Sequence, residues 1–169
     1  MDPILAAFLE AQWQEGSALA EQSDLLELER LDPQHIVAEF SCRGLVLDGN
    51  GQVAIAERFR VGYAFSDEYL RMADPSRVVT WLAPREIFHP NVGVPFVCIG
   101  PIAPGTPLTD ILYNTHQLIG YQNVTVNELD AVNFQACQWA RNNQHLLPVD
   151  TRPLKRRRVE PRIDQMEVA

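Results

Sequence analysis

The chain has 169 residues, an apolar content of 46% and a formal net charge of −8, which suits one globular domain that buries its own core. The tail from Val149 holds six basic and four acidic residues, so the body before it, with eight basic and 18 acidic residues, has a net charge of −10. An acidic body argues against nucleic acid as the main partner, and no apolar run approaches the length of a membrane span.

Cysteine usage and the first residues indicate the compartment. The start "MDPILAAFLEAQ" lacks the basic region of a secretory signal. The three cysteines, Cys42, Cys98 and Cys137, show neither a CxxC pair nor a Cys/His spacing, which argues against a zinc site and a disulfide framework. We therefore expect a cytoplasmic protein with reduced thiols, no metal and no cofactor.

The first predicted element is a helix. Asp2 can cap it, and Pro3 suits its first turn. Apolar residues follow at helical spacing as far as Trp13, and the pattern ends between Gly16 and Ser23. Because this helix carries little positive charge, we interpret its apolar face as a packing face and not as a membrane anchor.

Four strands are predicted next. Short alternating or apolar runs occupy residues 25–31, 35–46, 53–65 and 78–82, with a tight turn at 48–51. Short connections between successive strands predict an antiparallel meander and not a parallel sheet. The expected fold is α+β, with a four-stranded antiparallel sheet between an N-terminal helix and C-terminal helices.

The pattern stops after Leu82. Residues 83–107 contain six prolines, and an irregular stretch of this length inside a compact domain is usually functional. Helical spacing resumes at Leu108, and a last helix is predicted from Asn127, with Asp130 in a capping-box-like position. We predict a domain at 1–148 and a flexible basic and polar tail at 149–169.

Cys98 stands out in the irregular stretch. Cys42 and Cys137 fit buried positions on a strand and a helix, whereas "VPFVCIGP" places Cys98 between prolines and glycines. A reactive thiol there has two possible chemistries. A thiol hydrolase would use His89 or His116 as its base, but such nucleophiles commonly begin a helix, and prolines separate Cys98 from the next one. An acyl carrier needs an exposed sulfur and a donor for the developing oxyanion.

A family resemblance favours the carrier. The order of elements, the triplet His89-Pro90-Asn91, the following Cys98 and the segment "APGTPLTDILYNTHQLIGYQN" closed by Asn123 resemble the ubiquitin-conjugating enzymes. Without Cys98 the triplet would be interpreted as an ordinary turn. The chain differs from the family pattern in its Phe88, in the spacing to Cys98 and in lacking the tryptophan after the cysteine. This divergent pattern is similar to bacterial operon-encoded conjugating enzymes, some implicated in antiphage defence.

The resemblance implies roles for single residues. Cys98 would accept a ubiquitin-like protein as a thioester from an activating enzyme and pass it to a lysine of a protein target. Asn91 would stabilise either the loop or the oxyanion, and His89 would hold nearby backbone. Thr125 and Val126 occupy the position of the family's acid, so Asp130, with Glu128 second, is the candidate that assists the amine; helix capping explains both acids equally well. The alternatives are a non-catalytic binding or assembly protein of the same fold, and the thiol hydrolase.

Overall fold

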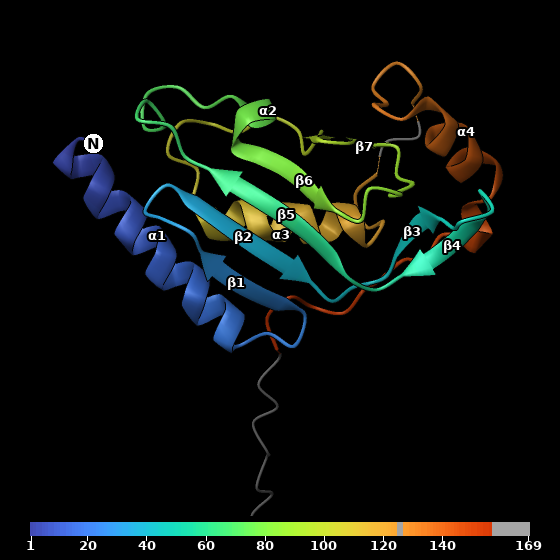
Figure 1. Cartoon of the computed structure of the whole chain (residues 1–169), viewed down its shortest axis with the longest axis horizontal. Coiled ribbons are helices and arrows are strands. Elements are labelled where there is room, and N and C mark those ends of the chain that lie inside the picture. Colours follow the sequence, from blue (N-terminus) through green and yellow to red (C-terminus); the bar gives the residue numbers. More distant parts are fainter. Residues whose placement is uncertain (125–126, 157–169) are drawn as a thin grey trace, which may run out of the picture.

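The computed structural model describes residues 1–124 and 127–156 and has an α+β fold (Figure 1). Its helices are α1 (Pro3–Glu21), α2 (Pro75–Val78), α3 (Leu108–Ile119) and α4 (Phe134–Asn142), followed by the short 3-10 helix η1 (Gln144–Leu146). Its strands are β1 (Leu26–Arg30), β2 (His35–Phe40), β3 (Gly44–Leu47), β4 (Val53–Ala56), β5 (Phe59–Ala64), β6 (Val79–Ala83), β7 (Val92–Gly93) and β8 (Phe96–Val97). The predicted α+β class is thereby confirmed.

The main sheet contains the predicted antiparallel meander but is larger than predicted. Its strand order is β1-β2-β5-β6-β8-β7, so the expectation of four strands was wrong. Strands β7 and β8 come from the irregular stretch, where Thr80 of β6 pairs with Phe96 of β8. Two-residue strands are too short to show an alternating pattern, which is why the sequence did not reveal them.

Two of the predicted strands are each divided. The run 35–46 splits into β2 and β3, and the run 53–65 splits into β4 and β5. Strands β3 and β4 pair with each other as a separate hairpin, closed by the predicted tight turn, in which the Gly51 N–H donates to the Asp48 carbonyl at 2.9 Å. Gly51 has a φ of 74° there, a conformation that glycine adopts without strain.

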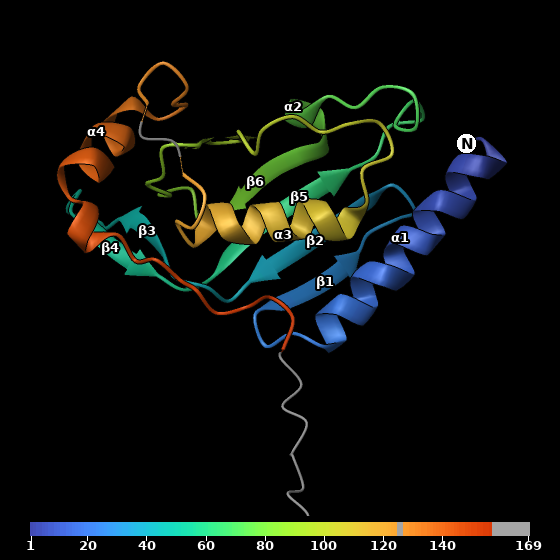
Figure 2. The ribbon, with the colours of Figure 1, turned by 180° about the vertical axis from the view of Figure 1, so that it is seen from behind.

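Helices α1 and α3 pack together against the sheet. Asp2 Oδ1 accepts from the Ile4 N–H at 2.7 Å and Pro3 opens α1, as predicted. Helix α3 lies across one face of the sheet (Figure 2). Its first residue, Leu108, donates its N–H to the buried Gln12 Oε1 of α1 at 2.8 Å. Gln12 thus provides the cap that Pro107 lacks.

The last helix starts later than predicted. Asn133, not Asn127, is the N-cap of α4, because its Oδ1 accepts from the Ala136 N–H at 3.0 Å. The N–H groups of Val132 and Asn133 both donate to the Pro90 carbonyl at 2.9 Å. These bonds tie residues 132–133 to the irregular stretch and prevent a helix from running through them.

The first part of the predicted flexible tail packs on the body. Asp150 and Leu154 are buried, and the Arg156 N–H donates to the Gln22 carbonyl at 2.8 Å. The boundary predicted at 148 therefore cuts through packed chain, and residues 157–169 lie outside the described residues. None of the helices in the described ranges has the length and apolar character that crossing a membrane requires.

Candidate functional site

His89 is a buried structural side chain of the Cys98 loop, by which we mean residues 88–98. Its Nε2–H donates to the Leu118 carbonyl at the end of α3 at 2.8 Å, and its Nδ1 accepts from the Asn91 N–H at 3.0 Å. Burial lowers the pKa of His89 to about 3, so the ring is neutral at physiological pH. Because both ring nitrogens have backbone partners, His89 cannot serve as a base for Cys98.

Asn91 and Cys98 bond to each other across the loop. The Cys98 N–H donates to the Asn91 carbonyl at 2.8 Å, and the Asn91 side-chain Nδ2 donates to the Cys98 carbonyl at 3.3 Å. The strands β7 and β8 pair antiparallel between them, through Val92 with Val97. The backbone of Cys98 is therefore fixed at both its N–H and its carbonyl.

The Cys98 thiol is accessible. All three cysteines lie in the described part of the chain, and only Cys98 is exposed. Cys42 is buried, and this burial raises the pKa of its thiol to about 12. Cys137 is buried inside α4. Cys98 is accordingly the cysteine that another macromolecule can reach.

Cys98 opens into a shallow pocket of about 240 Å³. Its walls come from the Cys98 loop, from α3 and from the chain that follows α3, and include Asn91, Gly100, Asn114, Leu118, Asn123 and Asp130. Gly100 has a φ of 87°, which glycine adopts without strain as the chain leaves the loop. The pocket brings a thiol, amide N–H donors and a carboxylate together.

The two candidate acids have different surroundings. Asp130 lines the pocket with Cys98 and accepts a hydrogen bond at its Oδ2 from Asn127 Nδ2 at 2.8 Å. Glu128 forms an ion pair with Arg141 of α4 at 2.9 Å. Since Asn133 caps α4, capping of this helix no longer explains Asp130. Thr125 and Val126, at the position of the family's acid, lie outside the described residues.

The second candidate base, His116, is also unavailable. It is buried in α3, its ring stacks on Phe40 with centroids 6.5 Å apart, and burial lowers its pKa. Among the described residues that line the pocket, none is a histidine. Both histidines that a thiol hydrolase was expected to use as its base are therefore buried.

Sequence reasoning missed Tyr121. Its hydroxyl donates to the Phe88 carbonyl at 2.8 Å, and its ring lies against His89 with centroids 4.5 Å apart. The sequence held no signal for this contact, because it joins residues 33 positions apart. Asn114 was missed as well, although its helical spacing of four from Leu118 could have placed both on one face of α3.

No protein-family model matches the chain, and no curated protein matches it. Within residues 1–124 and 127–156, no group of three or more His, Cys, Asp or Glu side chains is arranged to hold a metal ion. The chemical groups that the site itself presents are the Cys98 thiol, the amides of Asn91, Asn114 and Asn123, and the Asp130 carboxylate.

Proposed function

We propose that this protein is a conjugating enzyme that carries a ubiquitin-like protein as a thioester on Cys98 and transfers it to an amine. The observation that carries the proposal is the pair of hydrogen bonds between Asn91 and Cys98. They join the triplet His89-Pro90-Asn91 to an exposed thiol, so the residues that resemble the ubiquitin-conjugating family in sequence also form one unit in space.

The fold supports this proposal. An N-terminal helix, the antiparallel run β1-β2-β5-β6 and a helix α3 lying across the sheet after the cysteine follow the order of elements in ubiquitin-conjugating enzymes. The added strands β7 and β8 and the hairpin β3–β4 are compatible with a divergent member. A bacterial conjugation operon that also encodes an activating enzyme and a ubiquitin-like protein would supply its partners.

The proposed reaction has two transfer steps. In the first, the Cys98 thiolate attacks the thioester carbonyl carbon that joins the ubiquitin-like protein to the activating enzyme, and the activating enzyme's thiolate leaves. In the second, a lysine amine attacks the Cys98 thioester through a tetrahedral oxyanion, the C–S bond breaks, and the Cys98 sulfur leaves as thiolate. The amine loses one proton, so a net amide bond and a regenerated Cys98 result.

Asn91 and Asp130 have distinct roles in this proposal. Asn91 fixes the Cys98 backbone from both sides, so that the thioester stays in one geometry while the oxyanion forms. Asp130 shares the pocket with Cys98 and orients the incoming lysine: the ammonium proton goes to solvent, and Asp130 accepts the proton that the neutral amine loses during attack. A carboxylate does not lower the pKa of a lysine, because a negative neighbour favours the charged form. Desolvation at the thioester therefore has to lower the pKa of the lysine.

The two alternatives have less support. A thiol hydrolase needs a base beside the sulfur, and His89 and His116 are both buried away from that role. A non-catalytic protein of the same fold has no need of an exposed cysteine bonded to Asn91. Neither alternative accounts for Cys98 and Asp130 lining one pocket.

A charging assay tests the proposal. The protein is incubated with a cognate activating enzyme, ATP and a tagged ubiquitin-like protein, and adducts are separated with and without reductant. We expect a reducible adduct in the wild type, a hydroxylamine-sensitive oxyester in Cys98→Ser and no adduct in Cys98→Ala. Cys137→Ala is the matched control and should charge normally. A reducible adduct that persists in Cys98→Ala and disappears in Cys137→Ala or Cys42→Ala would overturn the assignment.

A further inference from the structure

The turn after α3 contains a residue in an unusual backbone conformation. Tyr121 has a φ of 55° and is buried. The position just beyond a helix often takes this left-handed conformation, but glycine normally occupies it. Tyr121 is not glycine, so its surroundings must hold it there, and such outliers concentrate at functional sites.

Tyr121 supports the start of the Cys98 loop. Its hydroxyl donates to the Phe88 carbonyl, and its ring packs on His89. His89 in turn donates to Leu118 and accepts from the Asn91 N–H. Since Asn91 holds Cys98 at its N–H and carbonyl, a continuous series of contacts runs from Tyr121 to the thiol-bearing backbone.

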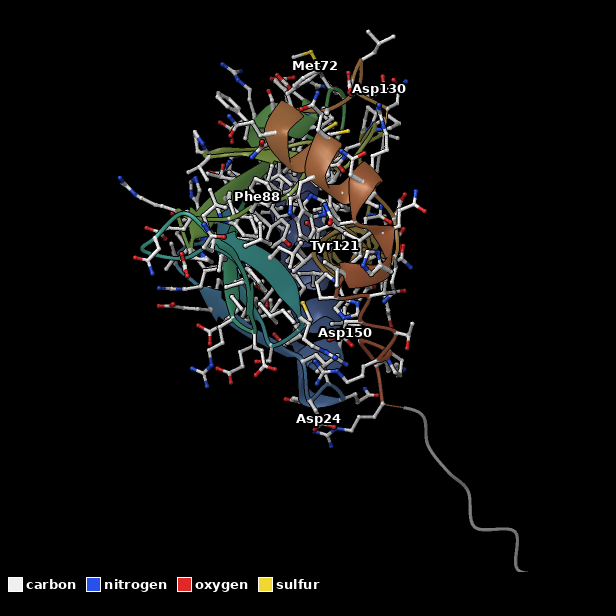
Figure 3. All side chains as sticks on the ribbon, turned by 90° about the vertical axis from the view of Figure 1, so that its right-hand side faces the viewer. Asp24, Met72, Phe88, Tyr121, Asp130 and Asp150 are labelled. Atoms are coloured by element: carbon white, nitrogen blue, oxygen red, sulfur yellow. The ribbon has the colours of Figure 1, made fainter. Side chains whose placement is uncertain are left out.

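The C-terminal segment 149–156 holds the same turn from the other side. The Asp150 N–H donates to the Gly120 carbonyl at 2.9 Å, and the Gln122 side-chain Nε2 donates to the Asp150 carbonyl. A Cβ at Gly120 would lie 3.2 Å from the Asp150 carbonyl oxygen, so the close approach favours glycine. In Figure 3, Phe88, Tyr121 and Asp150 follow one another in this order from upper left to lower right.

Asp150 is fixed in this position by charge and by hydrogen bonds. Its buried carboxylate accepts from the Arg152 guanidinium, with the shortest contact, to Nη2, at 2.6 Å, and from the Arg43 N–H at 3.0 Å. The hydrogen bonds from the Arg152 side chain and the Arg43 N–H hold the pKa of Asp150 well below its usual range. The segment therefore stays anchored at neutral pH.

We propose that Tyr121 is a positioning residue for Cys98, and that Asp150 and Arg152 of the C-terminal segment hold the turn in which Tyr121 lies. The part that concerns transfer rests on the proposed conjugating function, whereas the part that concerns the loop does not. The C-terminal segment thereby becomes part of the support of the site, although it lies more than 50 residues after Cys98 in the sequence.

Amide hydrogen exchange tests the positioning directly. The N–H groups of Asn91 and Cys98 are protected by bonds to His89 Nδ1 and the Asn91 carbonyl. Removing one supporting hydrogen bond with Tyr121→Phe should raise the exchange rate at both amides about fivefold, with no change in β2 and β5. Arg152→Gln should act in the same direction. The matched controls are Tyr113→Phe, in helix α3 just before this turn, and Arg156→Gln, whose guanidinium bonds to Ser23 and Asp24.

The outcomes separate positioning from general stability. Unchanged exchange at Asn91 and Cys98 in Tyr121→Phe, or an equal rise in β2 and β5, would overturn the proposal. An equal rise in Tyr113→Phe would overturn it as well. If only Arg152→Gln leaves these amides unchanged, the role assigned to the C-terminal segment is wrong.

Single-turnover discharge of the Cys98 thioester onto lysine tests the consequence for transfer. Tyr121→Phe should lower the rate at saturating lysine about fivefold while the half-saturating lysine concentration stays the same. A purely structural role would leave this rate unchanged in the folded protein and would overturn the proposal. If the wild type forms no thioester at all, the conjugating function fails, whereas the exchange measurements still decide whether Tyr121 positions the loop.

Discussion

The central strands β2, β5 and β6 and the Cys98 loop hold their backbones in different ways. Residue by residue, β2 pairs with β5 in an unbroken register from His35–Ala64 to Phe40–Phe59, over a core of buried aromatic and aliphatic side chains. The loop has only the short backbone pairing of β7 and β8 and relies in addition on side-chain bonds from His89, Asn91 and Tyr121. We therefore expect single substitutions to change stability most in the sheet and to change the geometry of Cys98 most in the loop.

The largest expected effect concerns the sheet. Phe59 is completely buried in β5, and its ring lies 5.8 Å from that of Trp81. Phe59→Ala should lower the free energy of unfolding by about 3–5 kcal/mol, measured by urea unfolding, while the folded fraction still charges on Cys98. The control Leu129→Ala changes a side chain that is 93% exposed and should shift stability by less than about 0.5 kcal/mol. Similar losses in both variants would contradict the comparison.

Asn91→Ala should affect the rate of transfer more than it affects stability. It removes the donor to the Cys98 backbone carbonyl, and a reacting group that is misplaced by about 1 Å can lose about 10²-fold in rate. We expect discharge of the thioester onto lysine to slow by this factor, with charging affected less. Asn142→Ala, at the exposed end of α4, is the control. Discharge at the wild-type rate would show that Asn91 only forms a turn.

His89 links the loop to stability through pH. Its pKa is about 3 in the folded protein because of burial, against about 6.5 when unfolded. As the pH falls below about 6.5, the unfolded chain therefore takes up the proton first, and stability decreases. This one group should lower the free energy of unfolding by about 2 kcal/mol at about pH 5 relative to about pH 7.5. Burial also lowers the pKa of His116, so His116 adds to the loss in the same direction.

Urea unfolding at both pH values measures this effect. His89→Gln should be less stable than the wild type at about pH 7.5 but should lose less stability on acidification. The exposed His145 gives a control in His145→Gln, which should keep the wild-type dependence. If His89→Gln also keeps the wild-type pH dependence of stability, His89 takes up its proton in the folded state and the neutral ring described above is wrong.

The smallest expected effect belongs to Asp130. Asp130→Asn should slow discharge onto lysine about tenfold, the effect of removing a hydrogen bond to a charged group, with little change in the melting temperature because Asn133 caps α4. Glu128→Gln is the matched control, since Glu128 pairs with Arg141. If Asp130→Asn discharges its thioester at the wild-type rate from neutral to mildly alkaline pH, Asp130 does not assist the attacking amine.

Local signals in the sequence determined much of the fold. Asp2 and Pro3 predicted the start of α1, alternation predicted the strands of the meander, and helical spacing predicted α3 from Leu108. The same reasoning singled out Cys98 as the cysteine outside regular structure, and the structure leaves it exposed. These features follow from residues close together in the chain, where caps and periodicity act.

Only the tertiary structure decided the rest, because it depends on partners far apart in the sequence. The Pro90 carbonyl accepts hydrogen bonds from the N–H groups of Val132 and Asn133, so α4 begins later than the sequence pattern predicts. The pairing of Phe96 with Thr80 creates strands that no pattern reveals. The Tyr121 hydroxyl donates to the carbonyl of Phe88, 33 residues earlier, and the Asp150 N–H donates to the carbonyl of Gly120. Such hydrogen bonds leave no periodic trace in the sequence, since each is made once, by one donor and one acceptor that folding brings together.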